Sequence, residues 1–400
     1  MIQVSMSSPD LTEAEFDAVR QVLKSNHLSL GPHVTQFEER FAEYVGARHA
    51  IAVSSGTAAL HLSLIASGVG EGDGVITSPF SFVASANCVL YERAVPIFVD
   101  VDPLTGNLDP ALVGAATEDL VRGGTAARRW LPPRLRTVAS CEATLKAVLP
   151  VHAFGQPADM RPIVNIAKAH GLHIVEDACE AIGAEYIGQR AGTFGQMACF
   201  AFYPNKQMTT AEGGMIVTDD ERCATLCSSL RNQGRDVFDA WLSHTRLGYN
   251  YRLSDMACAL GTVQLSRLDE MLEKRAKVAA WYDDRLFGIE GIRTPTIVPM
   301  TTRMSWFVYV VRFDSTEQRS LAMNALAERG IPSRPYFTPI HLQPFYVEKF
   351  GYRRGDFPIT EALGDTSLAL PFSSVMAEDQ VDVVCRELAA ILRRQPASHS

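Results

Sequence analysis

The chain has 400 residues, of which 47% are hydrophobic and 20% are charged, and its formal net charge is −8 at pH 7. This length exceeds what one hydrophobic core usually serves, so we expect a large domain and a smaller one. The negative charge argues against general nucleic-acid binding, because such proteins normally carry a basic surface. The sequence has no run of residues apolar enough for a membrane span, and its start lacks a signal-peptide pattern. We therefore expect a cytoplasmic protein without nucleic-acid or membrane partners.

The eight cysteines form no C-x-x-C pair, and most of them lie in apolar surroundings. A disulfide framework or a zinc site would need paired or closely spaced cysteines. We therefore expect buried free thiols, and we expect no metal site.

Helices and strands are predicted to alternate through the first two thirds of the chain. Residues 11–45 are expected to be helical, with a break at Gly31-Pro32. A further helix begins at Gly56, and predicted strands follow at 75–77, 95–99, 146–151, 172–175, 197–203 and 215–218. This alternation predicts an α/β fold with a mostly parallel sheet covered by helices on both faces.

The pattern changes after a long helical region at about 254–285. A strand at 307–313, a helix opened by the capping box at 315–318 and a last helix around 381–391 predict a small α+β domain. We place the boundary near residue 265, which gives domains of 1–265 and 266–400. The stretch 121–145 is rich in Gly, Arg and Pro, and we expect an exposed insertion there.

Gly56 and Thr57 stand at the start of a predicted helix. Free backbone N–H groups and the positive end of the helix dipole suit a phosphate there, and glycine permits its close approach. The alternative is that this segment only caps the helix.

Glu176 and Asp177 lie at the carboxyl end of a predicted buried strand, the end that faces the ligand crevice in an open α/β sheet. A carboxylate at that position can keep a pyridine nitrogen protonated, which makes the ring an electron sink. Because side chains alternate along a strand, only one of the two acids should point inward. A helix cap or a surface ion pair is the alternative, above all for Glu176.

Lys206 follows another predicted strand and precedes Glu212-Gly213-Gly214. A lysine at the end of a strand in a tight loop suits a Schiff base with a carbonyl cofactor. The alternative is a solvated loop lysine, which is what most lysines are. The phosphate-binding helix start, the strand-end acid and the lysine, in this order, favour the functional interpretation.

The sequence resembles the DegT–StrS type of nucleotide-sugar aminotransferases, which are fold-type I pyridoxal-phosphate (PLP) enzymes. The resemblance extends from about residue 9 to about residue 390. Its motifs are SSGTAAL at 54–60, PFSFVA at 79–84, VHAFGQP at 151–157, EDACEAIGA at 176–184, YPNK at 203–206, EGGM at 212–215, GYNYRLSD at 248–255, RPY at 334–336 and PIH at 339–341. The resemblance implies a seven-stranded, mostly parallel sheet in the large domain.

The resemblance also implies roles for single residues. Lys206 would be the Schiff-base lysine, and Asp177 would pair with the pyridine nitrogen of PLP. The backbone of Gly56 and Thr57 would bind the cofactor phosphate. Phe82 stands where the family places an aromatic side chain against the cofactor ring, although it could equally be a core residue.

Asn250 stands at the position where members of the family contact the PLP phosphate in the neighbouring subunit. The resemblance therefore implies a homodimer with shared active sites. Two positions depart from the family pattern. Ala201 replaces a serine that donates to the phosphate, so phosphate binding should depend more on the helix start, Asn205 and Asn250. Glu180 replaces a frequent glutamine near the cofactor phenolate, and its carboxyl should therefore be protonated or turned toward a donor.

The implied reaction moves an amino group from an amino acid, expected to be L-glutamate, to a keto group of a nucleotide-linked deoxysugar. Tyr336 and His341 are candidates for the sugar-nucleotide site, with structural packing as the alternative for each. One rival function is amination or dehydration of another substrate, such as a cyclitol or an aromatic precursor. Family dehydratases carry histidine in place of the lysine, so Lys206 argues against dehydration. The other rival is a non-catalytic regulatory protein, which the pair of Asp177 and Lys206 disfavours.

Overall fold

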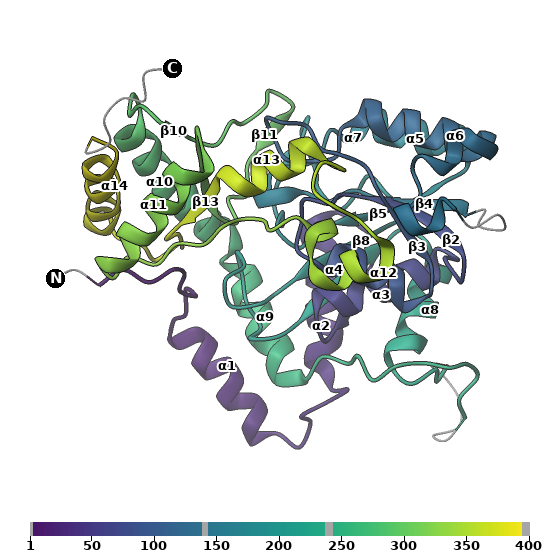
Figure 1. Cartoon of the computed structure of the whole chain (residues 1–400). Coiled ribbons are helices and arrows are strands. Elements are labelled where there is room, and N and C mark those ends of the chain that lie inside the picture. Colours follow the sequence, from purple (N-terminus) through teal and green to yellow (C-terminus); the bar gives the residue numbers. More distant parts are fainter. Residues whose placement is uncertain (1–2, 138–142, 237–242, 394–400) are drawn as a thin grey trace.

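A seven-stranded sheet forms the centre of the larger part of the molecule (Figure 1). The computed structural model describes residues 3–137, 143–236 and 243–393. From edge to edge, the strands are β1 (His49–Val53), β9 (Gly214–Thr218), β8 (Met197–Ala201), β5 (His173–Asp177), β4 (Thr144–Leu149), β2 (Asp73–Thr77) and β3 (Val95–Phe98). Strand β9 pairs antiparallel with β1 and β8, and the remaining pairings are parallel. The predicted mostly parallel sheet is confirmed.

Helices cover both faces of this sheet, as in other mostly parallel sheets, and the strands are therefore buried on both sides. One face packs against α3 (Gly56–Ala66), α4 (Ala84–Tyr91) and α8 (Glu221–Arg231). The other face packs against α2 (Pro32–Val45), α5 (Pro110–Arg122), α7 (Met160–His170) and α9 (Asp255–Ser266). Neighbouring strand residues therefore belong to different cores: Val53 packs with the α3 side, whereas Ala52 packs with the α2 side.

A second core is built from the C-terminal third of the chain. A three-stranded sheet of β10 (Ile292–Arg293), β12 (Tyr309–Phe313) and β13 (Ser367–Leu370) packs with α10 (Leu268–Leu286), α11 (Thr316–Glu328) and α14 (Glu378–Arg393). Val4 also belongs to this core, and Figure 1 shows the N-terminal end of the chain beside α14. We retain the domain boundary near residue 265 as a proposal. None of the helices in the described ranges combines the length and apolarity that a membrane crossing needs.

The remaining elements connect and cover these two cores. Strands β6 (Glu185–Tyr186), β7 (Gln189–Arg190) and β11 (Thr301–Arg303) form a small separate sheet. Helices α12 (Pro344–Phe350) and α13 (Pro358–Thr366) precede β13 in the chain, and Figure 1 places α12 next to α4.

The predicted insertion at 121–145 is only partly exposed. It contains α6 (Gly124–Arg128), whose residues contact α5. Leu131 is buried in the core beside α5, and the Trp130 indole donates a hydrogen bond of 2.9 Å to Asp119. The expectation of an exposed segment is therefore wrong for Leu131 and Pro132, which are buried and anchor the segment. Residues 138–142 of this stretch lie outside the described ranges.

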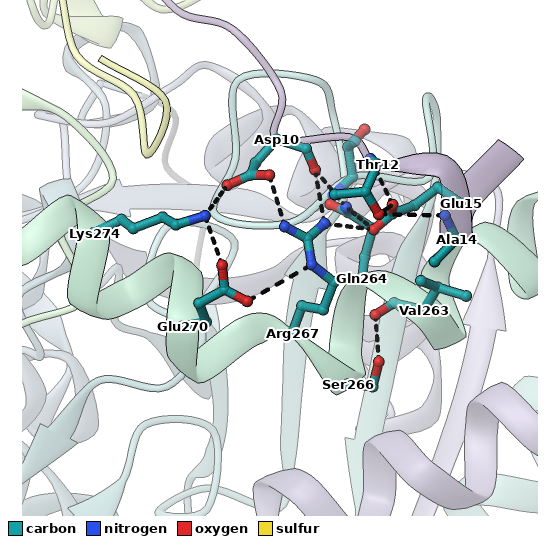
Figure 2. A network of polar contacts seen from close by, with 11 residues as sticks. Asp10, Thr12, Ala14, Glu15, Val263, Gln264, Ser266, Arg267, Glu270 and Lys274 are labelled. Atoms are coloured by element: carbon teal, nitrogen blue, oxygen red, sulfur yellow. Dashed lines mark hydrogen bonds and ion pairs between the residues drawn. The ribbon is translucent and has the colours of Figure 1, made fainter. Parts of the chain in front are cut away.

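An ion-pair network ties the start of α1 (Glu13–Lys24) to the junction of α9 and α10 (Figure 2). The Arg267 guanidinium donates at 2.8 Å to both Asp10 and Glu15, whose side chains are almost fully buried. Lys274 also reaches Asp10, at 3.0 Å, and the amide of Gln264 donates to Glu15 at 2.9 Å. Because α10 also packs in the C-terminal core, the network connects α1 to both parts of the molecule.

Arg267→Met should lower the free energy of unfolding by about 3 kcal/mol, because it leaves two buried carboxylates without their main cation. Burial alone would raise the pKa of Glu15, but hydrogen bonds from Thr12, Gln264 and Arg267 lower it from 4.5 to about 2. A carboxyl with a lowered pKa stabilises the fold above its unfolded pKa, and this contribution is lost as the pH falls toward about 2. Urea unfolding should therefore show a difference between wild type and variant that is large at neutral pH and shrinks below about pH 4. An equal difference in unfolding free energy between wild type and variant at neutral pH and below about pH 4 would contradict this prediction.

Candidate active site

A cavity of about 1290 Å³ lies where β5 and β8 end. The structure brings together most of the site residues that the sequence predicts, since the cavity is lined by Gly56, Thr57, Phe82, Asp177, Glu180, Asn205, Lys206 and Tyr336. These residues come from the start of α3, from the segment between β2 and α4, from the end of β5 and the loop after it, from the loop after β8, and from the segment before α12. Carboxyl ends of parallel strands are the usual position of ligands in open α/β sheets.

The start of α3 provides an anion site. The Ser55 hydroxyl caps the helix by accepting from the Ala58 N–H at 3.1 Å. The N–H groups of Gly56 and Thr57 belong to the first turn and have no partner within the helix, so they can bind an anion. Gly56 is required sterically, because a Cβ atom there would lie 2.7 Å from the Cβ of Ala201.

The two acids at the end of β5 point to opposite sides of the sheet. Asp177 lines the cavity, and its carboxylate accepts from the Ser85 hydroxyl at 2.7 Å and from the Cys179 N–H at 3.2 Å. Glu176 is fully buried on the other side, where it accepts from the backbone N–H groups of Gly192, Phe194 and Gly195 at 2.7–2.8 Å. Glu176 therefore supports the loop at 192–195, and Asp177 is the acid available to a ligand.

Lys206 is not a solvated loop lysine. Its side chain is only 13% exposed, and a turn closed by its N–H on the carbonyl of Tyr203 directs it back to the cavity. The ammonium Nζ lies 3.4 Å from Oε1 of Glu180 and 3.9 Å from the centre of the Phe307 ring. The amine is thus held between a carboxylate and an aromatic face.

The Glu180 carboxyl is turned toward hydrogen-bond donors. This is one of the two arrangements that the sequence predicts for it, the other being a protonated carboxyl. Its Oε2 accepts from the Phe154 N–H at 2.9 Å, and its Oε1 faces Lys206. Burial raises the pKa of the Glu180 carboxyl above its usual value, and the charge of Lys206 partly opposes this shift. The carboxyl can therefore hold a proton when the nearby positive charge is removed.

These groups match the chemistry of pyridoxal phosphate. A phosphate fits the free N–H groups of α3, a pyridine nitrogen fits Asp177, and an aldehyde fits the amine of Lys206. The buried Oδ1 of Asn205 has no hydrogen-bond partner in the structure, so the polar lining of this cavity is incomplete without a ligand. Phe82 is 64% exposed at the cavity, where an aromatic face is free to cover a ring.

Residues 9–389 match the model of the DegT/DnrJ/EryC1/StrS aminotransferase family. The chain belongs to this family. It is a pyridoxal-phosphate-dependent aminotransferase. GDP-perosamine synthase of Caulobacter vibrioides is 37% identical to it over 393 residues, which cover 98% of each chain. The crystal structure of DesV from S. venezuelae has 32% identity and a TM-score of 0.86, and the match covers 99% of this chain and 100% of DesV. The PLP form of the putative sugar aminotransferase Spr1654 from Streptococcus pneumoniae has 25% identity and a TM-score of 0.86, over 98% and 99% of the two chains.

Two predicted site residues of the aminotransferase lie outside the cavity lining. His341 is fully buried, and its Nε2 lies 3.0 Å from Oε1 of Glu361. Burial lowers the pKa of His341, although Glu361 opposes this shift, so packing is the better explanation of this residue. Asn250 is exposed, and its backbone pairs with Asn232. It therefore does not complete the cavity of its own chain.

The sequence did not indicate three residues that complete the site of the aminotransferase. Ser85 donates to Asp177, Phe154 donates its N–H to Glu180, and Phe307 lies beside the amine of Lys206. Ser85 directly follows the PFSFVA motif at 79–84, which is the local signal for it, and in the structure its hydroxyl lies 2.8 Å from that of Ser81. Phe154 lies in the VHAFGQP motif at 151–157, but that motif did not indicate its contact with Glu180, and no local pattern relates Phe307 to the site, because both reach it through tertiary contacts.

Proposed function

We propose that this aminotransferase moves an amino group from an amino acid, L-glutamate, to a keto group of a nucleotide-linked deoxysugar. The similarity to GDP-perosamine synthase over 98% of both chains carries this proposal. The cavity volume of about 1290 Å³ supports it, because sites for drug-sized ligands occupy roughly 300–1,000 Å³. The space beyond the cofactor can thus hold a substrate as large as a nucleotide sugar.

We assign a role to each residue around the cofactor. Lys206 holds the cofactor covalently through Nζ, and Asp177 keeps a proton at the ring nitrogen. Gly56 and Thr57 bind the phosphate with their backbone N–H groups. Asn205 contributes a further polar contact near the phosphate.

The chemistry then depends on proton transfer by Lys206. Pyridoxal phosphate, when bound, supplies the electron sink for the carbon atom that loses its proton. Once the amino donor has displaced Lys206, the free Nζ would take the proton from the α-carbon of the donor and deliver it to the cofactor, and it would carry out the same transfer in reverse with the keto substrate. Glu180, held by the Phe154 N–H, keeps a carboxyl within reach of this amine.

The wall of the cavity that contains Tyr336 is proposed to bind the sugar. Tyr336 lines this wall, and burial raises the pKa of its phenol, so the hydroxyl stays protonated and can donate a hydrogen bond to a sugar oxygen. Phe82 is proposed to cover the cofactor ring.

We propose that the enzyme is a homodimer with shared sites, in which Asn250 reaches the phosphate of the second subunit. The exposure of Asn250 supports this role, because its side chain is not used within its own chain to line the cavity. We also propose a cytoplasmic location, which the free state of all cysteines in the described ranges supports.

Single-turnover kinetics with nucleotide-linked ketosugars test the proposed substrate class. The enzyme is first converted to its pyridoxamine form with L-glutamate and freed of the keto acid. It is then mixed with GDP-, dTDP- or UDP-linked ketosugars, or with a free ketosugar and a cyclitol ketone as controls. We expect at least one nucleotide-linked ketone to restore the PLP absorbance rapidly, and the free ketones to react far more slowly. Equal rates with free and nucleotide-linked ketones would refute the substrate class while leaving the transaminase activity established.

A further inference from the structure

Arg275 is a buried cation on α10 that contacts the lysine loop of the site. Its side chain is only 2% exposed, although α10 carries solvent-facing residues on its other side. One guanidinium nitrogen donates to the carbonyl oxygen of Lys206 at 2.9 Å. The other terminal nitrogen donates to the carbonyl oxygens of Trp306 and Phe307 at 3.2 and 3.1 Å.

Arg275 is held by dipoles rather than by an opposite charge. Among its contacts in the described ranges are three carbonyl oxygens and no carboxylate. Burial lowers the pKa of its guanidinium to about 10, and the charge of Asp10 opposes this shift, so the guanidinium is still charged at neutral pH. Burying a charge without an ionic partner is costly, and a methionine or leucine could fill such a position in a core. A role of Arg275 beyond packing would explain why an arginine occupies this buried position.

The three carbonyl oxygens belong to two segments that meet at the amine of the site. Lys206 lies in the loop after β8, and residues 306 and 307 lead into β12 of the C-terminal core. The Phe307 ring lies 3.9 Å from the Nζ of Lys206, so the segment that Arg275 binds also supplies the surface under the amine. Trp306 has a positive φ of 50°, a conformation that L residues rarely adopt, and its carbonyl is one of the acceptors.

Other contacts join the same segments at their neighbouring residues. The Gln207 amide donates to the Ser305 hydroxyl at 2.7 Å. The Ser305 N–H donates to the carbonyl of Gly155 at 3.0 Å, beside the Phe154 N–H that binds Glu180. Arg275 is therefore the charged member of a set of contacts that fixes both sides of the lysine amine.

We propose that Arg275 is a positioning residue that locks the main chain of Lys206 against the Phe307 segment. A lysine side chain has four rotatable bonds and reaches one place reliably only if its backbone end is fixed. Arg275 fixes that end and the aromatic surface near the other end with one guanidinium group. This inference rests on the proposed role of Lys206 in catalysis.

Kinetics of Arg275→Met, with Arg275→Lys and Arg267→Met for comparison, test the proposal in the cofactor-loaded enzyme. Arg275→Met introduces an apolar, unbranched side chain that has no hydrogen-bond donor. We expect its kcat to fall by roughly tenfold or more, because displacement of a reacting group by about 1 Å can cost a factor of about 100. The KM values for the amino donor and the ketone should stay within about twofold, because Arg275 does not line the cavity. The circular dichroism band of the bound cofactor should change, because it reports how the cofactor is held.

The two comparison variants separate positioning from stability. Arg275→Lys keeps the charge and can still donate to some of the carbonyls, so it should recover part of kcat and of the dichroism band. Arg267→Met removes another largely buried arginine at the start of the same helix, and it should lower stability while leaving kcat and the band unchanged. If Arg275→Met does not fold, Arg275→Lys is compared with Arg267→Met instead. We then expect a lower kcat in Arg275→Lys and an unchanged kcat in Arg267→Met.

Two results would overturn the proposal. One is a wild-type kcat and dichroism band in Arg275→Met, or in Arg275→Lys if Arg275→Met does not fold. The other is a loss of activity in the Arg275 variant that is fully explained by a smaller fraction of folded protein, as expected for Arg267→Met. A failure of the proposed role of Lys206 is recognised separately, because borohydride would then attach the cofactor of the wild-type enzyme to another lysine.

Discussion

Lys206→Ala is expected to abolish transamination while leaving the fold intact. Alanine can neither hold the cofactor covalently nor carry the proton from the donor, and proton transfer by a positioned side chain alone contributes a factor of about 10²–10⁴. The loss of turnover should therefore exceed about 10⁴-fold. Steady-state rates measure the effect, and far-ultraviolet circular dichroism monitors the fold.

The fold should survive because the substitution leaves no unpaired charge in the site. Glu180 loses its cation, but burial already raises the pKa of its carboxyl, so this group can take up a proton. Lys277→Ala is a suitable control, because Lys277 is an exposed lysine on α10 and should be replaceable without loss of activity. Turnover by Lys206→Ala above about one per cent of the wild-type rate would remove Lys206 from the chemistry.

Asp177→Asn should retain the cofactor but lose most of the first half-reaction. The amide has nearly the same shape as the carboxylate and can still accept from Ser85, but it cannot stabilise a protonated ring nitrogen. Removing one such electrostatic contact typically costs a factor of about 10²–10³ in kcat, and we expect a loss of at least this size. Stopped-flow absorbance after mixing with L-glutamate gives the rate directly.

The neighbouring acid provides the matched control for Asp177→Asn. Glu176→Gln changes a fully buried carboxylate on the opposite side of β5, where it binds backbone N–H groups of the loop at 192–195. This variant should lower the free energy of unfolding but keep the half-reaction rate of the folded enzyme. A near-wild-type half-reaction in Asp177→Asn, or an equal loss in both variants, would mean that Asp177 has a structural role only.

The parts of the fold that depend on local patterns could be predicted from the sequence. The break at Gly31-Pro32 separates α1 from α2, and the alternation of helices and strands predicted a mostly parallel sheet, whereas its seven strands were implied by the family resemblance. Strand alternation also indicated that one acid of the Glu176–Asp177 pair would face the ligand side, and the structure places Asp177 on the cavity. These features follow from periodicity and turn residues, which a single sequence contains.

Features that depend on contacts between distant segments could not be predicted. The sequence left His341 open between a substrate contact and structural packing, and in the structure it is buried beside Glu361. Phe307 and Arg275 meet Lys206 only because the C-terminal core packs against the end of the large sheet. A buried arginine on α10 has no signature of its own, because its acceptors are backbone carbonyls that every residue carries.

Borohydride reduction of the purified, PLP-loaded enzyme tests the role of Lys206 most directly. Reduction makes the link between cofactor and lysine permanent, so proteolysis and mass spectrometry can identify the modified residue. We expect a phosphopyridoxyl group on the peptide that contains Lys206, and no such adduct in Lys206→Ala. An adduct on another lysine, such as Lys349 at the same cavity, would contradict the assignment of Lys206 as the residue that holds the cofactor.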